Sequence, residues 1–281
     1  MTFIVTLIAL LIERFFDWSH LRRWVWYSNY QRAATKRFSD KSPYFVLAVT
    51  IIPLLLLVVL VEVMVKHTLF GLVEFLFQLF LFLYCLGPQN LWADTFACIN
   101  ALVQGDTQLA GEKLKSSFGV TDASSRQALH GQLLKHIFIA ANRRIFAIVF
   151  WFMVLGPVGA VLYRTITLSS ADFPKQEAVP GLLHEARSIE SILDWIPVRI
   201  LACVFALGGH FVKVFSCWRK KPLLELKMNE DLLTECGAAA LGNNDIENIA
   251  EDGSLERSAI SLLDRSFVIT LVAVAIIVML N

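Results

Sequence analysis

The side chains best suited to chemistry in this sequence lie at the ends of its apolar runs. Arginine binds carboxylate and phosphate groups through a planar fork of N–H donors, and asparagine offers both a donor and an acceptor. These residue types favour a binding site for a small anionic ligand. The predicted site consists of Asn142, Arg143, Tyr163, Arg164, Asp194 and Arg199. No catalytic residue, cofactor or metal ligand is predicted among them.

The central apolar run carries the first part of this site. It extends without a charge from Ile145 to Tyr163, a length of about 28 Å in a helix, which roughly matches the hydrocarbon core of a bilayer. Near its far end stands the sequence Gly156-Pro157-Val158-Gly159. Proline removes an amide donor, so a helix interrupted here leaves carbonyl groups that protein or water must satisfy. The alternative is a simple kinked span, because glycine and proline are common in membrane helices.

The composition indicates an integral membrane protein. Of the 281 residues, 56% are hydrophobic and only 17% are charged, against about 25% charged in soluble domains. The net charge of +1 comes from scattered basic residues, which excludes a nucleic-acid-binding surface. The five cysteines have neither metal-binding nor redox spacing, and we expect reduced, structural thiols. We therefore expect an all-α fold, a polytopic membrane helical bundle with amphipathic cytoplasmic helices.

The chain is expected to form a single membrane domain with four to six spans, since two apolar segments are marginal. The predicted spans are 2–16, 45–65 with a kink at Pro53, 69–86, 145–163, 196–215 and 266–280. Two polar segments are expected at the cytoplasmic face. The first, 87–144, should contain helices over 90–103 and 106–118, broken at Gly105, and a third that begins near Asp122 and is capped by Asp122 or Ser124. The second is 216–265, and residues 164–195 are predicted to form a polar loop.

Glu74 is the predicted intramembrane acid. It lies four residues before Gln78 and therefore on the same helical face. A carboxylate at this depth costs several kcal/mol (about 2–4) unless it is paired, so that face should point into the bundle. Two interpretations stay open, a relay or binding acid and a structural partner to another helix.

The sequence Asp194-Trp195-Ile196-Pro197-Val198-Arg199 is predicted to open a helix. Proline is tolerated in a first turn, and aspartate is a preferred N-cap. Arg199 would then lie one turn inside, as a snorkelling side chain or as a partner of an acid or an anionic ligand. Arg164 and Arg199 are predicted to line one cavity.

Lysine and arginine counts predict the topology. Segments 13–43, 87–144 and 213–265 hold seven, six and seven, whereas 66–68 and 164–195 hold one and three. Because cytoplasmic loops are enriched in basic residues, both termini are expected outside.

Several sequence blocks resemble the membrane family that unites the cobalamin-biosynthesis proteins CobD/CbiB with AmpE. The resemblance extends over most of the chain and is carried by ALVQGDTQLAGEKL (101–114), AANRRIFAIVFWFMVLGPVGAVLYR (140–164), DWIPVRI (194–200), ECGAAALG (235–242) and AISLLDRSFVITL (259–271). The sequence of the central block and the LLDR sequence before the last helix are similar to those of the AmpE branch. That resemblance implies a regulatory signalling modulator in the inner (cytoplasmic) membrane of a Gram-negative bacterium, linked to cell-wall sensing and the β-lactam response.

The chain departs from the synthase branch of this family at the positions of two acids. Ala141 and Ile145 stand where the synthase pattern has acids beside its asparagine, and Thr167-Leu168-Ser169-Ser170 replaces its polar motif after Tyr163-Arg164. An enzyme that activates a carboxylate with a nucleotide needs acids for Mg²⁺. The resemblance therefore favours a regulatory protein over an enzyme.

Three functions remain to be compared. The first is a sensor or modulator that binds a small anionic ligand, such as a cell-wall fragment, and a cytoplasmic protein partner through 90–140 or 216–258. The second is an amide-forming synthase that joins an amine to a carboxylate with a nucleotide. The third is a small-molecule transporter, suggested by the broken helix and Glu74, although no inverted repeat is visible.

Overall fold

A computed structural model of the chain describes residues 2–15, 24–66, 71–86, 91–120, 125–171, 181–220, 228–242 and 252–280. These residues form helices and no strand, which confirms the all-α prediction. They divide into two compact units. The first comprises residues 1–88 and 147–193, and the second comprises 89–146 and 194–281.

The first unit is built from α1 (Thr2–Phe15), α2 (Val25–Arg37), α3 (Pro43–Val65), α4 (Leu72–Cys85), α8 (Ala147–Ser170) and the beginning of α9 (Leu182–Gly208). Helices α3 and α4 both pack against α8, and α1 packs against α4. A buried cluster of Leu47, Ile51, Ile166 and Ala186 joins α3, α8 and α9. The rings of Phe82 and Phe152 meet at 4.4 Å between α4 and α8.

The central helix has a kink at the predicted position, which is compatible both with an interrupted helix and with a simple kinked span. Within α8, Gly156 has φ 66° and ψ −152°, a non-helical conformation that favours glycine, and Pro157 follows it. The helix then continues past Arg164 to Ser170, which is further than the predicted span. Hydroxyl groups in this last part bond to carbonyls of the preceding turn, for example Thr165 to Val161 at 2.9 Å.

Two other prolines lie inside helices of the first unit or at its border, and a neighbouring side chain compensates each. Pro53 lacks the N–H that would bond the carbonyl of Val49, and the Tyr30 hydroxyl donates to that oxygen at 2.9 Å. Pro197 likewise leaves the carbonyl of Leu193 without a helical partner. The Trp151 indole N–H donates to it at 3.3 Å. These contacts allow both helices to continue through a proline.

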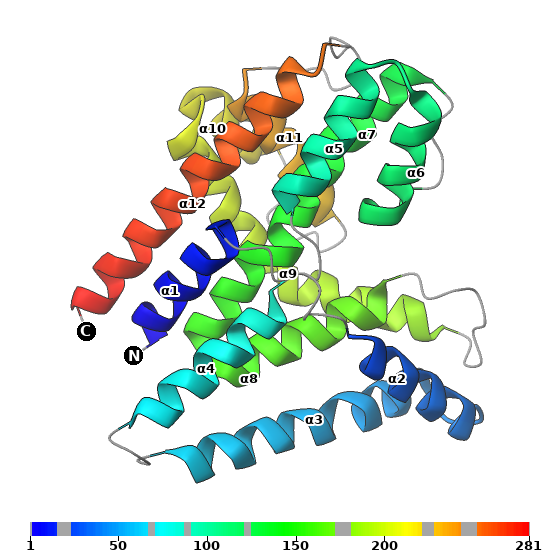
Figure 1. Ribbon diagram of the computed structural model, residues 1–281, viewed down its shortest axis with the longest axis vertical. Helices are drawn as coiled ribbons and strands as arrows, with labels where there is room; N and C mark the ends of the chain where they lie inside the picture. The colour runs from blue at the N-terminus through cyan, green and yellow to red at the C-terminus, as the bar shows by residue number, and fades with distance from the viewer. Residues whose placement is uncertain are drawn as a thin grey trace. The chain divides into compact units, whose positions relative to one another are not determined.

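The second unit is built from α5 (Leu91–Val103), α6 (Thr107–Phe118), α7 (Arg126–Ala141), a π-helical turn η3 (Asn142–Phe146), the end of α9, α10 (Phe211–Lys220), α11 (Asn229–Ala240) and α12 (Ser254–Leu280). Helix α7 packs against α5, α6, α11 and α12 (Figure 1). Its side chains Leu133, Leu134, Ile137 and Phe138 are fully buried. Gly237 of α11 lies so close that an added Cβ would be 2.6 Å from the Phe138 ring.

Several predicted boundaries are corrected. The N-cap of α7 is Ser125, whose hydroxyl accepts from the N–H of Ala128; Asp122 and Ser124 lie outside the described residues. The predicted helices over 90–103 and 106–118 are confirmed as α5 and α6, and Gly105 between them has φ 81°. Helix α9 begins at Leu182, inside the predicted polar loop, and ends at Gly208. Helix α12 begins at Ser254 rather than near 266.

By length and apolar composition, four helical segments in the described part of the chain are able to cross a membrane: Pro43–Val65, Arg126–Ser170, Leu182–Gly208 and Ser254–Ile276. The predicted spans 2–16 and 69–86 form shorter helices of 14 residues each. Phe16 and residues 67–70 lie outside the described residues. The number of spans, the single membrane domain and the positive-inside topology stay predictions.

Candidate functional site

Asn142 lies in the second unit where α7 passes into the π-helical turn. A π-turn adds one residue to a helical turn and occurs frequently at functional sites. The side chain of Asn142 is 2% exposed, and its Nδ2 donates to the Asp194 carboxylate at 2.9 Å. Its other polar atom, Oδ1, is buried and has no partner among the described residues. An acceptor buried in this way costs about 1–3 kcal/mol, so it marks a place for a donor.

Asp194 does not cap a helix, contrary to the prediction. It lies in the interior of α9, one turn before Pro197, and is 8% exposed. The proline is tolerated there because Trp151 satisfies the carbonyl that Pro197 leaves free. The carboxylate of Asp194 instead accepts the hydrogen bond from Asn142, a pairing that the sequence did not predict.

Arg199 is held by its own helix and by the start of α11. Its guanidinium stacks on the ring of Trp195 at 4.3 Å and donates to the Trp195 carbonyl at 2.7 Å. It also donates to Asn229 Oδ1 at 3.2 Å. Because α9 begins at Leu182, Arg199 is not near a helix N-terminus, which corrects the prediction that a helix end binds an anion there. Sequence analysis missed Asn229 because an isolated asparagine at a helix start resembles an ordinary cap.

Arg143 lies on the solvent-exposed side of these residues. Its guanidinium pairs with Glu230 at 3.1 Å, and the two side chains are 39% and 50% exposed. Glu230 lies in the first turn of α11, directly after Asn229. These side chains therefore range from a buried amide, Asn142, to a solvent-accessible arginine.

A small cavity lies among these side chains. Its volume is about 10 Å³, room for about one water molecule, and it is lined by Ile139, Asn142, Arg143, Asp194, Val198, Asn229, Glu230 and Leu233. Three separate hydrogen-bonded pairs thus lie at or next to this cavity: Asn142 with Asp194, Arg143 with Glu230, and Arg199 with the lining residue Asn229.

Tyr163 and Arg164, the remaining predicted ligand-binding residues, belong to the first unit. Both lie in α8 and are buried, with 0% and 5% of their surface exposed. The shared cavity for Arg164 and Arg199 stays a prediction. Glu74, the predicted intramembrane acid, accepts a hydrogen bond from Gln78 Nε2 at 3.3 Å, which confirms that the two share a helical face. Its role as a relay or as a structural partner stays open.

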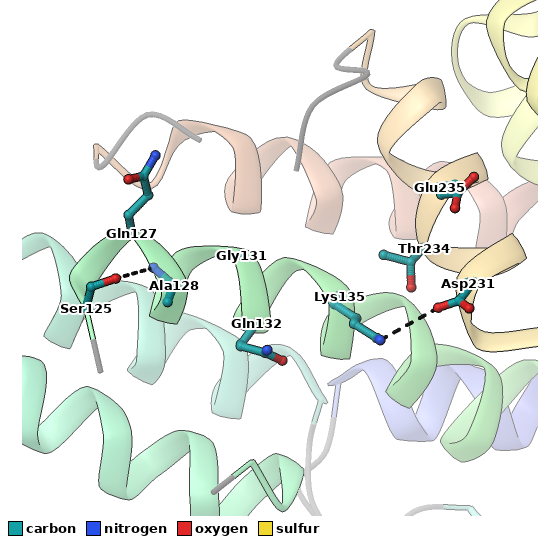
Figure 2. A pocket seen from close by; sticks show the side chains of 9 residues that line it. All are labelled: Ser125, Gln127, Ala128, Gly131, Gln132, Lys135, Asp231, Thr234 and Glu235. Carbon is teal, nitrogen blue, oxygen red and sulfur yellow. Dashed lines mark hydrogen bonds and ion pairs between the residues drawn. The ribbon is translucent and has the colours of Figure 1, made fainter. Parts of the chain in front are cut away.

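A larger cavity, of about 480 Å³, lies on the surface of the second unit between α7 and α11 (Figure 2). Its lining is polar or small: Ser125, Gln127, Ala128, Gly131, Gln132, Lys135, Asp231, Thr234 and Glu235. Lys135 and Asp231 face each other across it at 3.8 Å. Sequence analysis missed this groove because its two walls are about 100 residues apart along the chain.

A second buried polar pair joins α7 to α12. His130 Nδ1 and Glu256 Oε1 are 2.5 Å apart, and both side chains are fully buried. No group of three or more histidine, cysteine or acidic side chains converges within the described ranges. None of the five cysteines, all of which lie among the described residues, forms a disulfide. A hydrogen bond with the neighbouring Cys217, together with burial, raises the pKa of the Cys236 thiol.

The apolar helices and these buried polar clusters define a helical membrane protein. A family model described as "Regulatory signalling modulator protein AmpE" matches residues 1–281, the whole chain. The chain therefore belongs to the AmpE family of membrane regulatory proteins.

Individual relatives come from both branches of the larger resemblance. Protein AmpE from Shigella flexneri is 25% identical over 234 residues, 78% of each chain. The cobalamin biosynthesis protein CobD from Chromobacterium violaceum is 29% identical over 177 residues, which is 61% of this chain and 55% of the relative. CobD from Stutzerimonas stutzeri is 33% identical over 99 residues, 35% of this chain and 33% of the relative. The chain thus matches about half or less of the length of these two CobD proteins. No solved structure matches the chain.

Proposed function

We propose that the protein is a multi-pass inner-membrane modulator, linked to cell-wall sensing and β-lactamase induction in a Gram-negative bacterium, and that it binds a small anionic ligand without chemistry of its own. The observation that carries the binding site is Asn142, whose buried Oδ1 lies beside a cavity and next to the half-exposed Arg143. A ligand that places an anionic group on Arg143 and an N–H or O–H on Asn142 satisfies both. Cell-wall peptides carry carboxylates and amide N–H groups together.

The anionic group would take the place of Glu230. A solvent-exposed ion pair is worth only about 0–1 kcal/mol, so its replacement by a ligand carboxylate costs little. An arginine–carboxylate pair is also strongest when it is bidentate, a geometry that a mobile ligand adopts more easily than a helix-bound glutamate. The N-terminal end of α11 also favours an anionic ligand group at this place, because the N-terminus of a helix stabilises negative charge.

The cavity must open for such a ligand, because it holds only about one water molecule. The wall contributed by Asn229 and Glu230 is attached through the Arg199–Asn229 and Arg143–Glu230 contacts. Binding at Arg143 breaks the second contact. We propose that this release of the start of α11 is the signal, and that Tyr163 and Arg164 contribute to the same response from the first unit.

Thermal unfolding of the purified protein with a muropeptide mixture from digested peptidoglycan tests the site. Muropeptides should raise the unfolding temperature of the native protein. Glu230→Gln, which removes the competing charge, should increase that shift, and Arg143→Ala should abolish it. Lys135→Ala is the matched control, because it removes a cation from the other cavity of the same unit. An unchanged shift in Arg143→Ala would refute the site.

We further propose that a cytoplasmic protein partner binds in the groove between α7 and α11 (Figure 2). The groove falls within both segments that the sequence assigns to partner binding. Ala128 is exposed on its wall, so Ala128→Arg fills the groove without disturbing the core. In cells with a β-lactamase reporter, this variant should lose induction while the muropeptide shift of the purified protein remains. Normal induction in Ala128→Arg would exclude the groove.

The second candidate is an amide-forming synthase, favoured by the similarity to the two CobD proteins. Against it, Ala141 and Ile145, which stand at the acid positions of the synthase pattern, are both buried apolar side chains. The same thermal assay separates the two functions. Stabilisation by ATP with Mg²⁺, and none by muropeptides, would support the synthase.

The transporter needs a different test. Uptake of a small molecule into proteoliposomes that contain the protein, abolished by Glu74→Gln, would support it.

A further inference from the structure

Helix α10 is separated from the preceding apolar helix by a fixed bend. Helix α9, which is long and apolar enough to span a membrane, ends at Gly208, and α10 begins at Phe211. At Gly209 an added Cβ would lie 2.4 Å from the carbonyl oxygen of Ala240, so only a glycine allows the chain to pass this close to the end of α11. The N–H of His210 donates to the same carbonyl at 3.0 Å. These contacts end the span at Gly208, and the predicted span 196–215 is two helices.

One side of α10 is attached to α11. Val214 is 2% exposed, and the Lys213 ammonium donates to the carbonyl of Gly242 at 2.7 Å. Cys217 reaches Glu235 of α11 at 3.9 Å. The orientation of α10 about its own axis is therefore determined by α11, and its opposite side faces outward.

The outward side of α10 carries three apolar side chains and the exposed Ser216, and it ends in an arginine. Phe211, Val212 and Phe215 are 55%, 79% and 44% exposed, and they occupy one continuous face of the helix. The rings of Phe211 and Phe215 stack at 6.0 Å, and the Arg219 guanidinium lies 6.0 Å from the Phe215 ring. In the sequence, Lys220 and Lys221 follow directly. Exposed aromatic and aliphatic side chains beside basic residues are typical of helices that lie in the headgroup region.

Distance along the chain places α10 at the membrane surface. Ten residues of helix are about 15 Å long, which is too short to cross the hydrocarbon core. Only Gly209 and His210 separate it from the end of α9, so Phe211 lies within about 11 Å of the last residue of a span. The headgroup region extends about 5–8 Å beyond the hydrocarbon core on each side. Helix α10 therefore begins in or directly next to that region.

We infer that α10 is an interfacial anchor that docks its Phe211–Val212–Phe215 face into the bilayer surface, with Arg219 bound to anionic lipid headgroups. Charge complementarity selects this occupant: the exposed face carries three apolar side chains and its flanking charges are all basic, which matches an anionic leaflet. A second copy of the chain would bring Arg219 against its equivalent or against unmatched surface.

Photocrosslinking of the full-length protein in nanodiscs of equal parts phosphatidylcholine and phosphatidylglycerol tests the anchor. Phe215→p-benzoylphenylalanine should form lipid adducts that mass spectrometry detects. Leu57→p-benzoylphenylalanine is the positive control, because Leu57 is 58% exposed on the spanning helix α3. Glu112→p-benzoylphenylalanine, at an exposed position of α6, is the matched control within the second unit.

We expect lipid adducts at Phe215 comparable to those at Leu57 and at least ten-fold above those at Glu112. Phosphatidylglycerol adducts should exceed phosphatidylcholine adducts by up to about five-fold, the enrichment that one basic residue produces near an anionic surface. Arg219→Glu should bring that ratio to about one and keep the lipid adducts. Arg219 is exposed and contacts a ring of its own helix, so this variant should fold, and monodispersity on gel filtration checks it.

Three results would overturn the inference. Absence of lipid adducts at Phe215, while Leu57 forms them, would show that the face is not in the membrane. Adducts of twice the protein mass would show that a second copy covers it. An unchanged lipid ratio in Arg219→Glu would show that anionic headgroups are not bound there.

Discussion

Tyr30→Phe tests whether the contact between Tyr30 and the carbonyl of Val49 stabilises the protein because of Pro53. The Tyr30 hydroxyl donates to this carbonyl at 2.9 Å, and Pro53 has no N–H to offer it. In a lipid-embedded helix, a carbonyl without a donor has no water to replace the lost bond. Removal of the hydroxyl should therefore cost the desolvation of one acceptor, about 1–2 kcal/mol of unfolding free energy.

The effect of Tyr30→Phe should depend on residue 53. Pro53→Ala restores an N–H that bonds the carbonyl of Val49 within the helix. In the Pro53→Ala background, Tyr30→Phe should then cost less than about 0.5 kcal/mol, so the coupling between the two substitutions is about 1 kcal/mol. Whether Pro53→Ala by itself raises or lowers the unfolding free energy does not matter for this test. The double-mutant cycle compares only the cost of Tyr30→Phe in the presence and in the absence of Pro53.

Equilibrium unfolding in mixed detergent micelles measures the four proteins of this cycle. Tryptophan fluorescence and circular dichroism should give coincident transitions, which is the condition for reading a free energy from them. A Tyr30→Phe effect of the same size with and without Pro53 would refute the reasoning, because the hydroxyl would then stabilise the protein through some other contact. No effect in either background would mean that water reaches the carbonyl of Val49.

Three further predictions concern the second unit. His130→Ala or Glu256→Ala alone should lower the unfolding free energy by about 3–5 kcal/mol, because each leaves a buried polar side chain without its partner. The double variant His130→Leu with Glu256→Met should recover most of this loss, because both polar groups are replaced by apolar ones. A double variant as unstable as the single variants would contradict this. Gly237→Ala should cost about 1–3 kcal/mol by forcing the Phe138 ring away, and Phe138→Leu should relieve it in the same unfolding assay. Asp252 accepts two hydrogen bonds from the first residue of α12, the side-chain bond contributing most, and they lower its pKa. Since the pKa of Asp252 is lower in the folded than in the unfolded protein, this stabilisation is present at neutral pH and disappears as the pH falls below about 4. Asp252→Asn should therefore reduce the loss of unfolding temperature between neutral and acidic pH, which thermal unfolding measures.

The apolar runs were predictable because lipid-facing helices leave a strong compositional signal. The predicted span 45–65 lies within α3, and the predicted span 145–163 covers the end of η3 and most of α8. The non-helical conformation of Gly156 was expected from the proline that follows it. Helices α5 and α6 were found from their periodicity and from the break at Gly105. In each case the local sequence alone determines the element.

The first half of α9 was missed because its polar residues hid its apolar face. Leu182, Ala186, Ile189 and Leu193 recur at intervals of three and four residues, which is a helical period. They pack against α3 and α8 in the buried cluster of the first unit. Pro197 resembles a helix start, but here the Trp151 indole compensates the carbonyl that the proline frees, so the helix continues through it.

The candidate site shows a second limit of sequence reasoning. Residue types identified Asn142, Asp194 and Arg199, which lie at or next to one cavity, but they did not identify the partners Asn229 and Glu230 from α11. If the proposed ligand binds here, those partners would restrict what it can be. A lone arginine would bind any small anion, whereas in the proposed site Arg143 would exchange Glu230 for the ligand, so a simple anion at the same distance would gain little. Selectivity must then come from the donor that reaches Asn142, and a carboxylate linked to an amide N–H should bind where acetate or phosphate alone does not.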